Sequence, residues 1–240
     1  MVSRSTYRRP VDSLTAVAAE VVACRACPRL VAWREQVGRD KRAAYAGEEY
    51  WARPVPGFGS PSAAVLVVGL APAAHGGNRT GRVFTGDRSG DWLFASMYRT
   101  GFANQPESRH AGDGLELRDA WIAAAVRCAP PANKPLPEER DNCLPYAVEE
   151  LRLIQPVVIV CLGKFAWDAA CGLLGIQPRP VFGHLAEHST EGGPVLLGSY
   201  HPSQQNTFTG KLTEPMLDAV FEEARRIAGE SVMVPRSKTP

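Results

Sequence analysis

The sequence lacks the segments that would direct it into or across a membrane. No run of about 18 apolar residues occurs in the 240-residue chain, so no segment is predicted to span a bilayer. Residues 1–10 lack the apolar core of a signal peptide. We therefore expect a cytoplasmic protein, in which the six cysteines are reduced and metal binding is more common than disulfide formation.

A large excess of charge is also missing. The formal net charge is +2, and the composition of 45% hydrophobic and 22% charged residues is typical of a soluble globular protein. A chain without a global positive charge can bind nucleic acid only through a local basic surface.

Two common nucleotide-binding motifs are absent as well. No G-K-[ST] follows a predicted strand, since residues 210–212 read Gly-Lys-Leu, and no G-x-G-x-x-G occurs in the first glycine-rich loop. Neither an internal repeat nor a Ser/Gly-rich linker divides the chain. We expect one domain over residues 1–240, with flexible tails at about 1–10 and 231–240.

What the chain has is a regular alternation of strands and helices. Apolar runs predict strands at residues 63–69, 119–126, 157–162 and 195–200. Helical spacing predicts helices at 12–22, 89–100, after Pro137, at 164–174 and at 213–228, while 35–62 reads mostly as loop. The fold class predicted is α/β, a three-layer α/β/α arrangement around a four-stranded, mainly parallel sheet.

Polar loops follow three of these strands. They comprise residues 69–87, with five glycines, residues 129–135 and residues 201–213. Because the carboxyl ends of parallel strands share one edge of a sheet, the three loops predict a cleft there. Glycines allow the first loop to approach a ligand closely, although a purely structural connection explains them too.

Four cysteines form a candidate metal site. Cys24 and Cys27 make a C-x-x-C motif, and Cys128 and Cys143 lie near the ends of later elements. Four thiolates suit either zinc or an iron–sulfur cluster, and the alternative is that they are simply buried. No thioredoxin-like strand precedes the motif, which disfavours thiol redox chemistry. Cys161 and Cys171 are predicted to pack in the core.

These loops and cysteines together resemble a known family. Residues 69–87 and 201–213 look like the two signature motifs of the family 5, or type B, uracil-DNA glycosylases, and the four cysteines resemble the [4Fe-4S] ligands of families 4 and 5. The resemblance covers about residues 20–230. It implies a monofunctional DNA glycosylase that removes uracil and other damaged bases and leaves an abasic site for base excision repair. It also favours an iron–sulfur cluster, which would act as a structural staple, over zinc.

The resemblance implies roles for residues in the loops. Base excision requires the nucleotide to be turned out of the duplex, and cleavage passes through a cationic sugar. Phe84 would stack on the base, Asn133 would read its edge or hold water, His201 would donate to base O2, and Asp87 would position water. Each has a structural alternative: core packing for Phe84, a turn for Asn133, strand termination for His201 and a helix N-cap for Asp87.

Further pocket residues follow from the same motifs. Gly69, Ala71 and His75 would line the base pocket, and His184 would lie near it unless its role is structural. Ala71 stands where other families have an acid or asparagine, which shifts water activation to Asp87. A less polar pocket discriminates less, so we also expect activity on hypoxanthine and ethenocytosine. His110 and His188 are predicted to lie on the surface.

The expected partner is DNA. Ser203, Gln204 and Gln205 resemble a loop that wedges into the space left by the flipped base, and Arg79, Arg82 and Lys211 would neutralise phosphates unless they are ordinary surface charges. We expect a monomer associated with the nucleoid. Two alternative functions are a non-catalytic damaged-DNA-binding protein of the same fold and a zinc-stapled hydrolase of small nucleotides.

Overall fold

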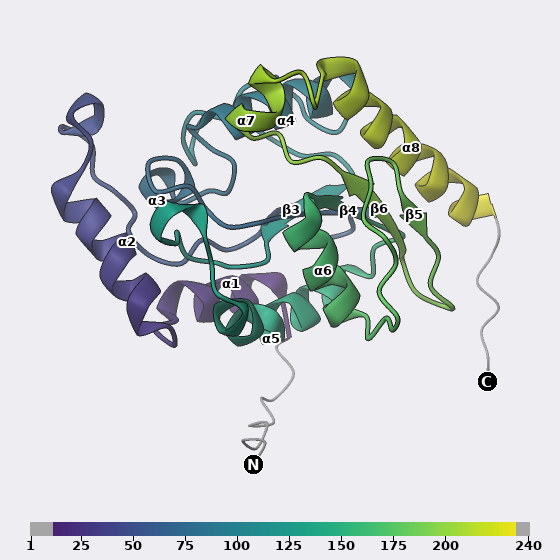
Figure 1. The fold of residues 1–240 in the computed structure, drawn as a ribbon, viewed down its shortest axis with the longest axis horizontal. Coiled ribbons are helices and arrows are strands. Elements are labelled where there is room, and N and C mark those ends of the chain that lie inside the picture. Colours follow the sequence, from purple (N-terminus) through teal and green to yellow (C-terminus); the bar gives the residue numbers. More distant parts are fainter. Residues whose placement is uncertain (1–11, 234–240) are drawn as a thin grey trace, which may run out of the picture.

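The computed structural model describes residues 12–233 and is built on a mixed sheet (Figure 1). Six strands lie in the order β1-β3-β2-β4-β6-β5. Their bounds are β1 Phe58–Gly59, β2 Val65–Gly69, β3 Ala120–Ala124, β4 Val158–Leu162, β5 Glu187–His188 and β6 Val195–Ser199. The four central strands are parallel and the two short edge strands are antiparallel to their neighbours. The predicted α/β class and the four parallel strands are confirmed, and the edge strands are additional.

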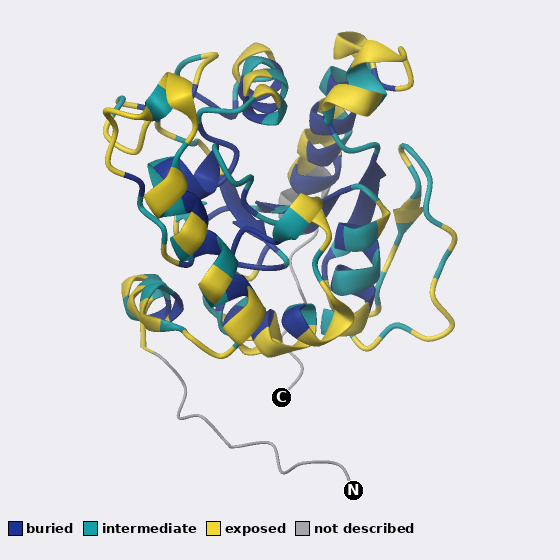
Figure 2. Ribbon diagram, turned by 60° about the vertical axis from the view of Figure 1, so that its left-hand side comes forward, coloured by how far each residue is buried: buried dark blue, intermediate teal, exposed yellow. Residues whose placement is uncertain are grey.

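The central strands are apolar because both faces of the sheet are covered. Every residue of β3 and β4 is buried, as expected for parallel strands between two helical layers. In Figure 2 these strands are dark blue, whereas the outward faces of the helices are yellow.

Helices form the outer layers. Their bounds are α1 Leu14–Ala23, α2 Pro28–Asp40, α3 Gly77–Thr80, α4 Arg88–Arg99, α5 Pro137–Ile154, α6 Lys164–Leu173, α7 Gln204–Phe208 and α8 Glu214–Met233, with 3₁₀ turns at Ala43–Tyr45 and Pro131–Asn133. Apolar residues of α4 and α8 pack with Val65 and Val67 of β2, while α5 and α6 pack with Leu66 of the same strand. Since alternate residues of a strand face opposite sides, helices cover both faces, and the three-layer prediction is confirmed.

The predicted loop at residues 35–62 is wrong at its start. Helix α2 extends to Asp40 and begins with Pro28 at its first position, where proline is favoured. Its buried face consists of Leu30, Arg34 and Val37. A buried arginine in this stripe breaks the apolar periodicity that predicts a helix.

Two other predictions concern the ends of the chain and its core. The predicted tails lie outside the described residues, except for 231–233, which are the last turn of α8. Cys161 and Cys171 are buried in β4 and α6, which confirms their predicted place in the core. Among residues 12–233, no helix is both long enough and apolar enough to cross a bilayer.

Candidate active site and cysteine centre

A cavity of about 820 Å³ opens at the carboxyl edge of the parallel strands. All three predicted loops contribute to its wall. The predicted site residues that line it are Ala71, His75, Phe84, Asp87, Asn133, His201, Ser203, Gln204 and Gln205. The structure therefore brings these residues to one place, as the topology of the sheet predicts.

Phe84 stands against the end of β2. Its ring centroid lies 6.0 Å from that of His201, with the two planes tilted by 36°. Gly69 makes this position possible, because a Cβ at residue 69 would lie 2.5 Å from Phe84 Cζ. Phe84 is only 9% exposed and belongs to the core cluster, so it packs in the core and lines the cavity at once.

Asp87 caps a helix and also lines the cavity. Its Oδ1 accepts a hydrogen bond from the backbone N of Gly90 at 3.0 Å and caps α4. Its Oδ2 lies over Gly76, where an added Cβ would come within 2.1 Å. Burial raises the pKa of Asp87 above its ordinary value, and hydrogen bonds from the amides of Gly90 and Ser89 oppose this only in part. One oxygen thus caps the helix, and the other remains at the cavity.

His201 follows β6 and is held by its own loop. Its carbonyl accepts hydrogen bonds from the backbone N of Ser203 at 2.8 Å and from Asn206 Nδ2 at 2.9 Å. Burial lowers the pKa of His201 to about 4. The imidazole is therefore neutral at pH 7 and offers one N–H donor.

Asn133 lies across the cavity in a short 3₁₀ turn. Both Asn133 (φ 54°) and Ala132 (φ 53°) adopt left-handed backbone conformations, which are unfavourable for alanine and tolerated by asparagine. Asn133 therefore forms part of the turn and also lines the cavity. Strain of this kind often occurs where a loop must present a side chain to a ligand.

His75 has a partner that sequence reasoning missed. Tyr50 Oη lies 3.0 Å from His75 Nδ1. Burial, followed by the charges of Arg42 and Arg79, lowers the pKa of His75. Tyr50 lies in a segment predicted as loop, with no motif to connect it to the site. His75 thus both lines the cavity and anchors its loop.

The remaining histidines lie away from the cavity wall. His184 Nδ1 accepts from the backbone N of Tyr200 at 3.2 Å, and its ring lies 5.1 Å from that of Tyr200. Its contacts thus support the structural alternative. His110 is exposed in a loop, and His188 is half-buried in β5.

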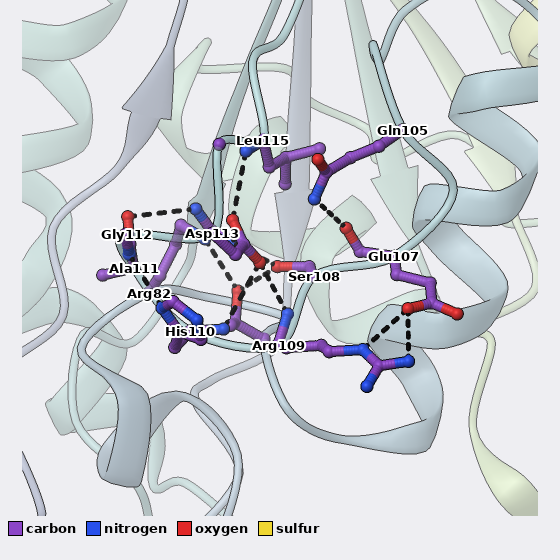
Figure 3. A network of polar contacts seen from close by, with 12 residues as sticks. Arg82, Gln105, Glu107, Ser108, Arg109, His110, Ala111, Gly112, Asp113 and Leu115 are labelled. Atoms are coloured by element: carbon purple, nitrogen blue, oxygen red, sulfur yellow. Dashed lines mark hydrogen bonds and ion pairs between the residues drawn. The ribbon is translucent and has the colours of Figure 1, made fainter.

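Arg79 and Arg82 do not present free charges to solvent. Arg79 is buried, pairs with Glu48 at 2.5 Å and lies 4.0 Å over the ring of Tyr45. Figure 3 shows the network around Arg82, whose Nη2 donates to Asp113 Oδ1 and Ser108 Oγ, both at 2.7 Å. Although burial opposes its charge, hydrogen bonds from Arg82 and two backbone amides lower the pKa of Asp113 to about 2.

The burial of these two arginines contradicts the prediction that they contact DNA phosphates. Both guanidinium groups instead form hydrogen bonds within the glycine-rich loop, Arg79 to the carbonyls of His75 and Gly86 and Arg82 to the hydroxyl of Thr85. The sequence alone does not distinguish an arginine that is buried against a carboxylate from one that is exposed. Lys211, by contrast, is exposed, with its Nζ 4.8 Å from the ring centroid of Tyr200.

The four predicted metal ligands surround one small space. Cys24 follows α1, Cys27 precedes α2, Cys128 follows β3, and Cys143 lies in α5. Burial raises the pKa of Cys128 to about 12 and that of Cys143 to about 11. Both are therefore neutral thiols at pH 7 unless a bound metal ionises them.

Three donors point at these sulfurs. Arg34 Nη1 donates to Cys128 Sγ at 2.9 Å, Asn142 Nδ2 to Cys27 Sγ at 3.4 Å, and the backbone N of Arg127 to Cys143 Sγ at 3.5 Å. Arg34 is 2% exposed, and no motif reveals it beyond its i+4 spacing from Leu30. Such donors stabilise negative charge on sulfur, which indicates that this space suits an anionic metal–thiolate centre.

The cysteine centre and the cavity share a wall. Ala71 and Phe165 pack against Leu30, Val126, Cys128 and Cys143, and both also line the cavity. A change in the packing around the cysteines is therefore expected to change the shape of the cavity.

Comparison with known proteins agrees with this geometry. Residues 56–225 match the model of the uracil DNA glycosylase superfamily. The chain is 53% identical to a type-5 uracil-DNA glycosylase of Mycobacterium tuberculosis, over 90% of this chain and 82% of that protein. It is 52% identical to the type-5 enzyme of Thermus thermophilus, over 87% and 95% respectively.

The chain is less similar to a type-4 enzyme than to these type-5 enzymes. Identity to a type-4 uracil-DNA glycosylase of Archaeoglobus fulgidus is 30%, over 73% of this chain and 80% of that protein. The chain thus belongs to the uracil DNA glycosylase superfamily and, within it, to the type-5 uracil-DNA glycosylases.

Proposed function

We propose that this protein excises uracil from DNA by hydrolysing the N-glycosidic bond, leaving an abasic site. The observation that carries the proposal is the convergence of Phe84, Asp87, Asn133 and His201 on one cavity at the carboxyl edge of the sheet. The names of the type-5 relatives support the same substrate.

In this proposal the cavity receives a base turned out of the DNA. The ring of Phe84 gives a flat surface for stacking, and the Asn133 amide can donate to and accept from the polar edge of uracil. His201 donates a hydrogen bond to base O2. Because its imidazole is neutral, the bond strengthens as negative charge develops on the departing base.

Asp87 acts on the other half of the reaction. Its Oδ2 orients a water toward C1′ of the sugar and stabilises the cationic sugar as the bond to the base breaks. The water oxygen forms the new bond to C1′, its proton passes to the carboxylate, and uracil leaves with the bonding electron pair. Ala71 contributes no polar group to this step.

We also propose that other damaged bases, hypoxanthine and ethenocytosine, are substrates. The cavity of about 820 Å³ has room beyond a pyrimidine ring. The methyl group of Ala71 leaves no buried polar atom unpaired when a different base enters.

We infer that the cysteine centre holds a [4Fe-4S] cluster. Four thiols surround one space, and such a cluster is held by four cysteines. The hydrogen bonds that Arg34, Asn142 and the backbone of Arg127 donate to the sulfurs support this proposal. When bound, it would cross-link α1 and α2 to β3 and α5; hydrolysis transfers no electrons and needs no redox step from it.

An incision assay tests the proposed function. Duplexes carrying one uracil, hypoxanthine or ethenocytosine are incubated with the protein, and abasic sites are cut with alkali. We expect cleavage at the modified base, none at thymine and no turnover of free deoxyuridine. Binding to damaged DNA without cleavage would instead identify a non-catalytic damage-binding protein. Turnover of free nucleosides would identify a small-nucleotide hydrolase.

The pH profile gives a separate prediction. Asp87 works ionised and its pKa is raised, so the single-turnover rate should fall with decreasing pH at values above the ordinary carboxyl range. His201, with a pKa of about 4, stays neutral and adds no inflection near its ordinary value. Rates measured from about pH 5 to pH 9 test this. A dominant inflection near pH 6.5 would show that a histidine titrates instead.

We propose that the protein acts on DNA in the nucleoid. We also propose that it works as a monomer.

A further inference from the structure

Tyr50 and His75 form a hydrogen-bonded pair at the wall of the cavity, and the mechanism above uses neither of them. Tyr50 Oη lies 3.0 Å from His75 Nδ1, and the two rings meet edge to face with their centroids 6.0 Å apart. His75 lines the cavity, whereas Tyr50 does not and is only 7% exposed. The Nδ1 side of the imidazole is thus turned to Tyr50, and His75 Nε2 has no hydrogen-bond partner among residues 12–233.

The burial of Tyr50 determines which nitrogen of His75 carries the proton. Within the described residues, the Tyr50 hydroxyl has no hydrogen-bond partner other than His75. If His75 Nδ1 donated to the hydroxyl oxygen, the hydroxyl proton would be left without an acceptor, which is costly in a buried position. Tyr50 therefore donates to Nδ1, and the neutral imidazole carries its own proton on Nε2. His75 thus offers one N–H donor to the cavity.

Hydrogen bonds to α3 hold this pair in place. The backbone N of Trp51 donates to the carbonyl of Arg79 at 2.9 Å, which fixes the residue after Tyr50 against α3. Arg79 Nε in turn donates to the carbonyl of His75 at 2.8 Å. The N–H of His75 therefore has a fixed direction before a ligand binds, so less conformational entropy is lost on binding.

A cation without an ion-pair partner lies on the same wall. Arg42 is exposed, lines the cavity and forms no ion pair with any of the described residues 12–233. Burial first, and then the charges of Arg42 and Arg79, lower the pKa of His75, so its imidazole is neutral at pH 7 and lies within range of the Arg42 charge. A neutral N–H donor beside a guanidinium group suits an anion with several oxygen atoms. An uncharged base edge would leave the guanidinium group without a partner.

We propose that His75 Nε2 and Arg42 bind a backbone phosphate next to the extruded nucleotide, and that Tyr50 is a positioning residue that keeps the His75 proton on Nε2. The inference rests on the proposed function, because a nucleotide turned into the cavity brings the phosphates on its two sides to the cavity wall. Phosphate contacts fix the register of a protein on DNA without reading its sequence. This subsite replaces the phosphate contact predicted for Arg79, which supports His75 from within the loop.

Duplexes with one uncharged phosphate position test the subsite directly. Each duplex carries one 2′-fluoro-2′-deoxyuridine, which binds without being cut because fluorine disfavours the cationic sugar. A methylphosphonate replaces the phosphate on the 5′ side of this nucleotide in one duplex and on the 3′ side in another. We expect the wild type to bind one of the two about tenfold more weakly than the unmodified duplex, as for a lost hydrogen bond to a charged group.

Variants of the two phosphate partners should reduce this sensitivity. His75→Ala and Arg42→Gln are each expected to weaken binding of the unmodified duplex about tenfold. The methylphosphonate should then weaken their binding only about threefold, because one partner of the phosphate is already missing. His75→Gln, whose amide still donates, should recover part of the loss. Arg42→Gln should also reduce the slope of log Kd against log salt concentration by about one.

Tyr50→Phe separates positioning from packing, because it keeps the buried ring and removes only the hydroxyl. NMR of the imidazole nitrogens should place the His75 proton on Nε2 in the wild type and show a mixture of both tautomers in Tyr50→Phe. Binding of the unmodified duplex should weaken in this variant. A proton on Nδ1 in the wild type would refute the role assigned to Tyr50.

Arg39→Gln is the matched control, because Arg39 is an exposed arginine in the last turn of α2 that does not line the cavity. It should keep the full methylphosphonate effect. The subsite is refuted if the wild type binds all three duplexes equally, or if His75→Ala and Arg42→Gln keep the full effect. It is also refuted if Arg39→Gln loses the effect as far as Arg42→Gln does, since binding would then depend only on general charge. Failure of uracil cleavage by the wild type would refute the proposed function, and the incision assay reads that outcome independently.

Discussion

Replacing Asp87 by asparagine is expected to slow single-turnover uracil excision by about two to four orders of magnitude, the range typical of lost acid–base assistance. Asparagine keeps the shape of the side chain and remains a good N-cap, so α4 should stay intact. What it loses is the negative charge that orients water and stabilises the cationic sugar. Single-turnover measurement on a uracil duplex isolates this chemical step from product release.

Two comparisons separate the roles of the two Asp87 oxygens. Asp87→Ala should lose the N-cap as well, at a cost of about 1 kcal/mol in the free energy of unfolding. Glu222→Gln changes an exposed acid of α8 that does not line the cavity and should cut at the wild-type rate. If Asp87→Asn also cuts at the wild-type rate, Asp87 is only a helix cap.

The local roles assigned from sequence to Asp87, Phe84 and Asn133 share one property. Each has a structural alternative, and the structure shows that alternative at a residue that also lines the cavity. Asp87 caps α4 with one oxygen and faces Gly76 with the other. Phe84 packs in the core and lines the cavity. A small site on rigid elements uses the ends of those elements, so a residue that caps a helix or packs in the core can also face the cavity.

The parts that sequence could not predict have physical causes. β2, β4 and β6 were found because parallel strands buried on both faces are continuous apolar runs. β1 and β5 have two residues each and leave no pattern. Helix α2 was missed because Arg34 occupies its buried face. Arg79 and Arg82 were placed on the surface because a charge buried with its partner has no sequence signature.

The shared wall explains why a structural centre belongs in this enzyme. Ala71 and Phe165 pack against the apolar cluster that contains Cys128 and Cys143, and both line the cavity. Their backbone comes from the loop after β2 and from α6, so neither is fixed by the cysteines themselves. Because close-packed interiors transmit strain, we expect disorder at the cysteine centre to disturb the cavity through this packing.

Replacing Cys128 by alanine is accordingly expected to remove the proposed cluster and destabilise the protein strongly. Loss of the anionic centre leaves Arg34 as a buried cation without its partner, which costs about 3–5 kcal/mol. Iron content and the brown colour should fall together, and thermal melting should shift down. Uracil excision should fall more than tenfold as Ala71 and Phe165 lose their support.

Cys171→Ala supplies the matched control for this prediction. Cys171 is a fully buried cysteine in α6 that lies outside the cysteine centre, so its loss should leave iron, colour and excision unchanged and cost only its packing. Equal loss of iron in both variants would show that a general effect of core mutation, not ligation, explains the result. A colourless wild-type protein that holds stoichiometric zinc when prepared without oxygen would exclude the cluster. Arg34 would then stabilise a zinc–thiolate site through the same hydrogen bond to Cys128.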